Sequence, residues 1–196
     1  YGLATNSDLW IGSPHGNKSE IFSINVTPTV AWKPVDGFTV AIGVQGEYFR
    51  GTFSSQSPAT GVNFLSVVAD DIAFGFVGGI LIEPTDTLDI GIGFRSSIDH
   101  KLEGDGSFLP AAYLNDDMSA RVKTPEMVTL GVRWQATEDW TFMGGVEWAN
   151  WSRVESLDIS LDNAGVVLST PENWKDSWFF SLGAEYAMTD QLTLRA

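Results

Sequence analysis

Two neighbouring segments of the chain, 88–103 and 118–135, carry five of its 11 basic residues. In an extended strand residues of one parity share one face, and these five all have odd numbers: Arg95, Lys101, Arg121, Lys123 and Arg133. Counted from the loop between the segments, Lys101 and Lys123 come to the same height, with Asp99 and Glu103 between them. Such a patch could hold a carboxylate by charge-assisted hydrogen bonds. The simpler interpretation is a cross-strand ladder of ion pairs that stiffens a sheet, and both remain open.

Other chemistry has little support in the residues. There is no Cys, and the only histidines, His15 and His100, lie far apart in the chain. Parity places His100 on the face opposite the basic residues, near the outer rim. No nucleophile stands beside a histidine as a serine hydrolase would need. We therefore predict no catalytic residue, no metal site, no cofactor and no enzyme activity. The formal net charge of −14 argues against a nucleic-acid partner, because phosphate binding needs basic patches.

The elements that carry these residues show strict alternation. In 88–103 the even positions are almost wholly apolar and the odd positions hold every acid and most polar groups. The same split recurs at 38–50 and 128–135. Alternation predicts β-strands with one apolar face. We expect that face to contact lipid through ten residues: Val40, Ile42, Val44, Ile90, Ile92, Phe94, Leu130, Val132, Phe180 and Leu182.

Strand length and aromatic residues separate a membrane barrel from a soluble β-sandwich, which also alternates. Strands in soluble proteins have about five or six residues, whereas a tilted membrane strand needs about 9–11. The expected strands are long: 20–33, 38–54, 70–83, 88–103, 118–135, 140–160, 174–187 and 191–196. Aromatic residues form two bands, as at the two interfaces of a membrane. One band lies near the turns and one near the loops: Trp32, Phe38, Trp134, Trp140 and Tyr186, then Tyr48, Trp148, Trp174 and Trp178.

Short turns recur about every 50 residues, at 34–37, 84–87, 136–139 and 188–190, and alternate with longer polar loops at 55–69, 104–117 and 161–173. Outer-membrane barrels have short periplasmic turns and longer extracellular loops. The pattern predicts an all-β fold: an antiparallel transmembrane β-barrel in a bacterial outer membrane. We expect a single domain over 1–196, comprising about eight strands of a larger barrel.

Several short motifs, in order along the whole chain, resemble one family. They are Tyr1-Gly2-Leu3-Ala4-Thr5, Phe74-Gly75-Phe76, Phe94-Arg95-Ser96, Pro125-Glu126-Met127, the run Trp148 to Ser152, Trp174-Lys175-Asp176-Ser177-Trp178 and Leu192-Thr193-Leu194-Arg195. The chain resembles the outer-membrane long-chain fatty acid transporters and their relatives that take up aromatic hydrocarbons. The resemblance implies a 14-stranded barrel plugged by an N-terminal hatch, with the hatch and the closing strands outside this sequence.

The resemblance also implies passive uptake of hydrophobic molecules. Parity places small or apolar residues in the lumen, among them Gly43, Gly75 and Gly79, which suits a hydrophobic ligand or a closely packed hatch. We expect a fatty acid whose carboxylate contacts the basic residues and whose chain contacts Phe49, Met143 and Phe179. One of the family's basic contact positions falls near Asp158, an acid, which keeps a monoaromatic hydrocarbon open as substrate. A general diffusion porin is the other alternative.

The expected partners are a hydrophobic small molecule, together with outer-membrane lipid and lipopolysaccharide. The complete protein is expected to be a monomer.

Overall fold

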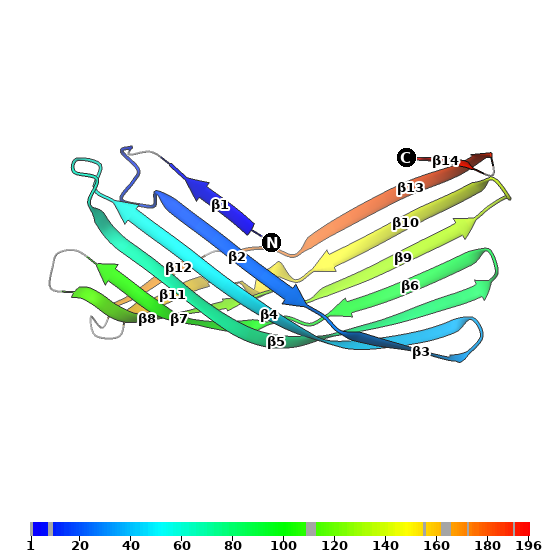
Figure 1. Ribbon diagram of the computed structural model, residues 1–196, viewed down its shortest axis with the longest axis horizontal. Coiled ribbons are helices and arrows are strands. Elements are labelled where there is room, and N and C mark those ends of the chain that lie inside the picture. Colours follow the sequence, from blue (N-terminus) through cyan, green and yellow to red (C-terminus); the bar gives the residue numbers. More distant parts are fainter. Residues whose placement is uncertain are drawn as a thin grey trace.

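The computed structural model describes residues 2–7, 10–108, 113–154, 156–161, 166–171, 173–189 and 191–196. One sheet contains all 14 strands, and the sheet curves into an open trough (Figure 1). The strands are β1 (Gly2–Asn6), β2 (Lys18–Val26), β3 (Thr29–Val35), β4 (Phe38–Gln56), β5 (Asn63–Thr85), β6 (Leu88–Arg95), β7 (Asp99–Phe108), β8 (Tyr113–Lys123), β9 (Met127–Gln135), β10 (Trp140–Ala149), β11 (Ser156–Leu161), β12 (Val166–Pro171), β13 (Ser177–Thr189) and β14 (Leu192–Arg195). A short 3-10 helix, η1 (Trp151–Arg153), lies between β10 and β11.

In five places two consecutive strands lie end to end and together cross the sheet once, with a break between them. These pairs are β2 and β3, β6 and β7, β8 and β9, β10 and β11, and β12 and β13. The long strand β4 pairs with β2 along one part of its edge and with β3 along the rest. On its other edge it pairs with β5, which pairs in turn with β7 and then β6. The pairs β8 and β9, β10 and β11, and β12 and β13 continue the same antiparallel meander. The predicted fold class is confirmed, and the described residues add β1, a crossing that the sequence analysis missed.

The breaks lie at one level of the sheet. They fall at Thr27–Pro28 and at 96–98, 124–126, 150–154 and 173–176, which we call the break band. Within the part of the chain that the structure describes, only β4 and β5 cross this level without interruption. Among the described residues, no helix is long and apolar enough to cross a membrane.

The apolar face is continuous across six strands on the side of the break band that carries the short turns. Cross-strand pairing from β4 to β13 aligns a row of outward residues: Val40, Ile80, Ile92, Leu130, Val146 and Phe180. The neighbouring rows contain the other predicted lipid-facing residues, so the prediction that these residues share one face is confirmed. On β4 the apolar belt runs from Phe38 to Tyr48. At about 3.3 Å per residue that is ~33 Å along the strand, or ~25 Å of height at a tilt of about 40°.

Aromatic rings border the belt. Near the turns the indole of Trp140 lies 4.7 Å from the Tyr186 ring and 5.8 Å from the Phe142 ring, between centroids. At the other border Trp148 and Trp178 are cross-strand partners. This placement agrees with the two predicted aromatic bands.

The predicted loops are shorter than expected, because strands extend beyond the membrane belt. β4 continues to Gln56 and β5 begins at Asn63, so only 57–62 joins them, in place of the predicted 55–69. Strands β7, β8, β11 and β12 likewise occupy much of 104–117 and 161–173. Outside lipid a strand can be polar on both faces, so these extensions lack the alternation that marks a membrane strand.

The turns are as tight as predicted. Between β3 and β4 the turn places Gly37 at φ 77°, a left-handed backbone conformation that glycine adopts without steric cost. The turns at 36–37, 86–87 and 136–139 lie at one end of the trough, and the loop 57–62 lies at the other (Figure 1). We refer to these as the turn end and the loop end.

A one-residue offset at the break band reverses the parity of two strands. Between β5 and β6, odd residues oppose odd residues, as Gly79 opposes Gly93. Between β5 and β7, odd residues oppose even ones, as Ala69 opposes Gly104. A one-residue offset moves every side chain to the other face. β8 follows β7 in register, with Leu102 opposite Ala120.

The offset gives the loop end its own core on the lumen side. Even residues of β7 and β8 pack there with odd residues of β5, in a buried cluster of Leu65, Val67, Ala69, Leu102, Met118 and Ala120. On the loop-end side of the break band the lumen face is therefore apolar. Its residues have even numbers on β7 and β8, whereas the lumen residues on the turn-end side have odd numbers.

Candidate functional site

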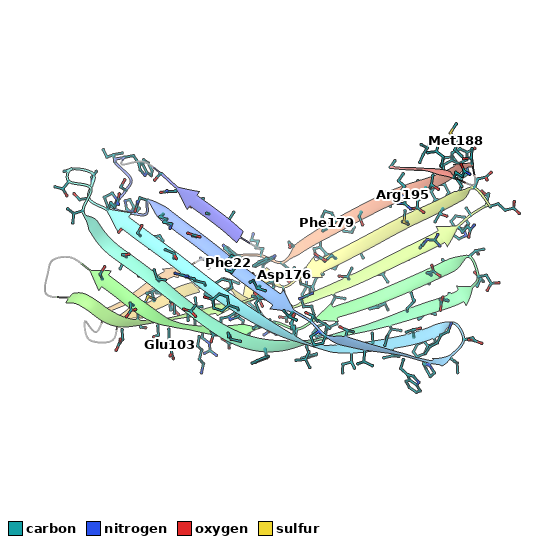
Figure 2. The ribbon with its side chains drawn as sticks, in the orientation of Figure 1. Phe22, Glu103, Asp176, Phe179, Met188 and Arg195 are labelled. Atoms are coloured by element: carbon teal, nitrogen blue, oxygen red, sulfur yellow. The ribbon has the colours of Figure 1, made fainter. Side chains whose placement is uncertain are left out.

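Three of the five residues of the predicted basic patch do not lie in the lumen. Leu102, next to Lys101, is 5% exposed and belongs to the lumen-side core. Alternation therefore turns Lys101, Arg121 and Lys123 to the outer face. In Figure 2, Glu103, which shares their face, lies on the convex side of the trough, whereas Phe179 lies on the concave side. The prediction that these three residues line the lumen is wrong, because it assumed one unbroken strand over 88–103 and another over 118–135.

Four of the predicted lumen residues do lie on the lumen face. Arg95 opposes Val77 of β5, on the same side as Gly79 and Gly93. Phe49 packs against the buried cluster. Met143 opposes Gly183, and Phe179 opposes Glu147. Arg95, Met143 and Phe179 therefore lie at the break band or on its turn-end side, and Phe49 lies on its loop-end side.

The prediction for His100 is also wrong. Its side chain is completely buried on the lumen side, where its ring lies 5.1 Å from that of Phe49. The Nδ1 atom lies 3.1 Å from a carboxylate oxygen of Asp71, and Nε2 lies 4.0 Å from a carboxylate oxygen of Glu47. The offset at 96–98 is again the reason, because parity counted from Leu88 no longer holds beyond it.

A second polar group adjoins His100 at the break band. Gln45, 1% exposed, donates from Nε2 to the backbone oxygen of Ser96 at 3.0 Å and accepts from Arg95 at 2.8 Å. The Ser96 hydroxyl accepts the backbone N–H of Phe76 at 2.9 Å. Asn25 donates to Glu47 at 2.7 Å. Buried polar groups need such partners, so these bonds explain how a polar lumen layer is stable between the apolar core and the glycine-rich surface below it.

Glycine provides the space for this layer. A Cβ atom at Gly75 would lie 2.5 Å from Gln45 Nε2 and 2.7 Å from the Ser96 hydroxyl. At Gly43 it would lie 2.6 Å from the backbone oxygen of Pro28, where the β2–β3 crossing bends. These glycines allow close approach of neighbouring segments.

The sequence motifs meet at the break band. Glu126 accepts hydrogen bonds from Asn150 at 2.8 Å and from Arg153 at 2.7 Å. Asp176 accepts from the indole of Trp148 at 3.2 Å and from the backbone N–H of Ser152 at 3.1 Å. Each carboxylate satisfies groups that a broken ladder would otherwise leave unpaired.

On the turn-end side of the break band, the lumen face includes a row of small side chains. One row across five strands consists of small residues apart from Leu81: Leu81, Gly91, Gly131, Gly145 and Ser181. Two of the arginines on this face form ion pairs: Arg133 lies 3.6 Å from Asp89, and Arg195 lies 2.6 Å from Glu185. Arg95 has a neutral partner, Gln45, and retains further N–H donors.

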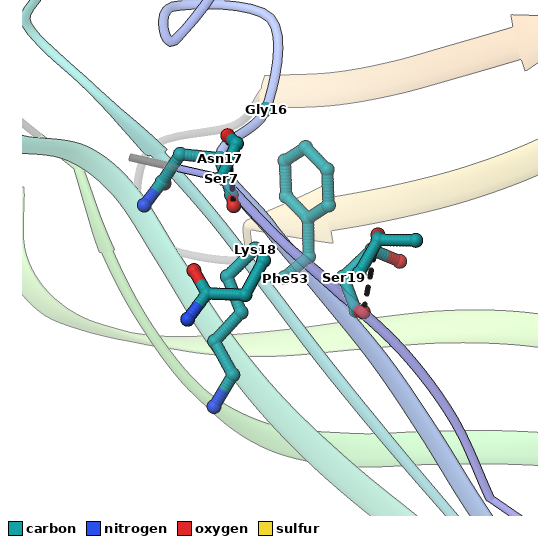
Figure 3. Close-up of a pocket in the computed structure, with 8 residues that line it drawn as sticks. Ser7, Gly16, Asn17, Lys18, Ser19 and Phe53 are labelled. Carbon is teal, nitrogen blue, oxygen red and sulfur yellow. Dashed lines mark hydrogen bonds between the residues drawn. The ribbon is translucent and has the colours of Figure 1, made fainter. Parts of the chain in front are cut away.

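A shallow hollow of about 210 Å³ lies at the loop end between β1, β2 and Phe53 (Figure 3). Its lining includes Ser7, Gly16 and Asn17 together with the Phe53 ring. Within the described residues, no three histidine or acidic side chains are grouped so that they could hold a metal ion.

The comparisons with known proteins agree with this geometry. Residues 1–196 match the family described as outer membrane protein transport protein (OMPP1/FadL/TodX). The chain belongs to this family. It is 21% identical to the long-chain fatty acid transport protein of Escherichia coli O6:H1, covering all of this chain and 53% of that protein.

Solved structures of the family have the same fold. A FadL homologue of Pseudomonas aeruginosa superposes with a TM-score of 0.87 at 22% identity, over 100% of this chain and 53% of that one. The toluene transporter TbuX of Ralstonia pickettii superposes with a TM-score of 0.79 at 17% identity, over 99% and 62%. The chain therefore spans about half the length of these relatives. The trough is part of an outer-membrane β-barrel, and these relatives are described as transport proteins.

Proposed function

We propose that this chain forms part of an outer-membrane channel for the passive uptake of hydrophobic small molecules. The supporting observation is the combination of a lipid-facing belt with a lumen face rich in glycine and small residues. Such a surface offers few polar groups to a water-filled pore, unlike the charged rings that line many channels. Membership of the transport family supports the same function.

The substrate class has two candidates, and the lumen charges distinguish them. A fatty acid needs a cation for its carboxylate once it leaves bulk water, because an unpaired buried charge is very costly. With Lys101, Arg121 and Lys123 on the outer face, Arg95 is the candidate cation, since its side chain has no acidic partner among the described residues.

The second candidate is an uncharged monoaromatic hydrocarbon. The described lumen face carries several acids, among them Glu47, Asp71 and Glu147, and these repel a carboxylate. A neutral ring needs only apolar contact, which Met143 and Phe179 can provide. The monoaromatic hydrocarbon is therefore the second candidate substrate, alongside a fatty acid.

The test is uptake by cells that express the complete protein with Arg95→Gln. Glutamine keeps the hydrogen-bonding capacity and removes the charge. If Arg95 holds a carboxylate, uptake of a long-chain fatty acid falls about 10-fold or more, as expected when a charge-assisted bond is lost, while toluene uptake is unchanged. Arg133→Gln, whose arginine is already paired with Asp89, is the matched control.

Equal uptake of the fatty acid by Arg95→Gln and the unmodified protein would favour the hydrocarbon. A channel with high conductance for salt and no saturable uptake of either substrate would refute the proposal in favour of a diffusion porin.

A further inference from the structure

The outer face of β7 and β8 carries a cluster of cations, which we call the outer cation cluster: Lys101, Arg121 and Lys123. Cross-strand pairing sets Lys123 opposite Asp99 and Lys101 opposite Arg121. Arg121 binds both oxygens of Asp99, through Nε at 2.8 Å and Nη2 at 2.5 Å. The carboxylate of Asp99 is therefore engaged by Arg121, which also has Asp158 of β11 as its cross-strand partner on the other side.

The two lysines lack a carboxylate partner of their own. Among the described side chains, neither ammonium lies within ion-pair distance of an acid, whereas Lys18 and Lys33 do, with Glu20 and Glu83 respectively. Lys101 also faces Arg121 directly across the ladder, and like charges in that position destabilise a sheet. An anion bound between them would remove this repulsion.

The cluster lies just beyond the lipid belt. The last outward apolar pair on these two crossings is Phe94 opposite Val128, and the same row continues to Trp148 and Trp178. Tryptophan marks the membrane interface. From Phe94 to Asp99 the chain advances five residues, at most ~16 Å along the strand and ~12 Å in height at a tilt of about 40°. Lysine side chains can reach back toward the interface over their apolar stems.

By reaching back from this height, the lysine side chains approach the level of the lipid headgroups. The polar zone on each side of the hydrocarbon is about 5–7 Å thick. The loop end, which we predict to be extracellular, faces the outer leaflet. A phosphomonoester there offers three acceptor oxygens and a charge of about −1.5 to −2. Arginine matches phosphate with its planar fork, and lysine binds it as a point charge.

We propose that the outer cation cluster binds the phosphate groups of phosphorylated glycolipid in the outer leaflet. The net charge of −14 would otherwise repel an anionic leaflet, and the cluster provides a local contact at the height of the phosphates. The acids Glu103 and Asp105 continue the same face farther from the membrane. This inference concerns the lipid-facing surface and is independent of the transported substrate.

The test compares Lys101→Gln/Lys123→Gln with the control Lys18→Gln/Lys33→Gln in the complete protein, purified in a neutral detergent. The control removes two lysines that already have acidic partners. Native mass spectrometry measures binding of bis-phosphorylated lipid A, dephosphorylated lipid A and inorganic phosphate. Each cation near an anionic surface contributes about fivefold, so we expect the cluster variant to bind bis-phosphorylated lipid A roughly 30-fold more weakly. The control should bind as the unmodified protein does.

Further results decide the proposal. Lys101→Arg/Lys123→Arg should retain binding, and dephosphorylated lipid A should bind no better to the unmodified protein than to the cluster variant. Equal binding of bis-phosphorylated lipid A by the cluster and control variants would overturn the inference, as would full competition by millimolar inorganic phosphate, which would indicate a free-anion site. If Lys101→Gln/Lys123→Gln does not fold, as judged by its heat-modifiable mobility on gels, the deciding measurement is how salt changes the binding of bis-phosphorylated lipid A to the unmodified protein. Binding to the unmodified protein that persists undiminished in 0.5 M salt excludes an electrostatic phosphate contact.

Discussion

Gly75→Ala tests whether the polar layer at the break band depends on close approach of β4, β5 and the 96–98 segment. The new Cβ would lie 2.5 Å from Gln45 Nε2, 2.7 Å from Ser96 Oγ and 3.0 Å from Ile98 Cγ1. All three neighbours are nearly inaccessible to solvent, at 1%, 8% and 2% exposure. They cannot move outward into water, so the clash must be relieved inside the wall.

The expected cost has two parts. Overpacking of a tight site costs about 1–3 kcal/mol. Displacing Gln45 also breaks its hydrogen bond to the backbone oxygen of Ser96, and a buried donor left unpaired costs about 1–3 kcal/mol. The two parts overlap, because a shift of Gln45 relieves some of the clash. We expect Gly75→Ala to lower the free energy of unfolding by about 2–4 kcal/mol.

The assay is a urea titration of the complete protein folded in lipid vesicles, followed by tryptophan fluorescence. Gly131→Ala is the matched control, because a Cβ there meets nothing within 4 Å on the same lumen face. We expect the control to change stability by no more than about 0.5 kcal/mol. Gln45→Ala combined with Gly75→Ala should show coupling, since the shortest of the three contacts disappears with the glutamine. If Gly75→Ala and Gly131→Ala shift the midpoint equally, the close packing at the break band is not what makes glycine necessary.

Two further predictions test the face assignments. Ile92→Arg, in the middle of the apolar belt, should cost about 2–4 kcal/mol in the same titration, whereas Ser119→Arg, on the outer face beyond the belt, should be tolerated; equal effects would contradict the belt boundaries. The chain has no Cys, so single cysteines can report orientation at the register offset: a membrane-impermeant maleimide should label Lys101→Cys on intact cells and leave Leu102→Cys unlabelled, and the reverse pattern would restore the lumen assignment of Lys101.

The lipid belt could be predicted from the sequence, because alternation is a local property. On β4 and β5 the strands run unbroken, so the parity of Val40 or Ile42 is sufficient to assign its face. The aromatic borders and the tight turns follow from residue types in the same way. The strand extensions near 57–62 were missed, because polar residues on both faces look like loop.

The candidate site was decided by the tertiary structure. In 88–103 the even residues are apolar apart from Ser96 and His100, yet Ile92 faces lipid and Leu102 faces the lumen core. The lipid-facing residues before the offset and the lumen-facing residues after it both have even numbers. The alternation of apolar and polar residues along the chain therefore does not reveal the offset. Ser96 carries the offset, and its role depends on Gln45 and Phe76, which belong to other strands.

The amino-acid sequence by itself determined the strand period, the compartment and the family, since these depend on spacing along the chain and on motifs. The tertiary structure places Lys101, Arg121 and Lys123 on the outer face and His100 on the lumen side. These positions depend on the pairing of β5 with both β6 and β7. Register is set between strands, by hydrogen bonds and packing that join residues far apart in the chain. A single extra residue at a break is therefore small in the sequence, and it exchanges the lumen and the lipid side for every residue that follows on that strand.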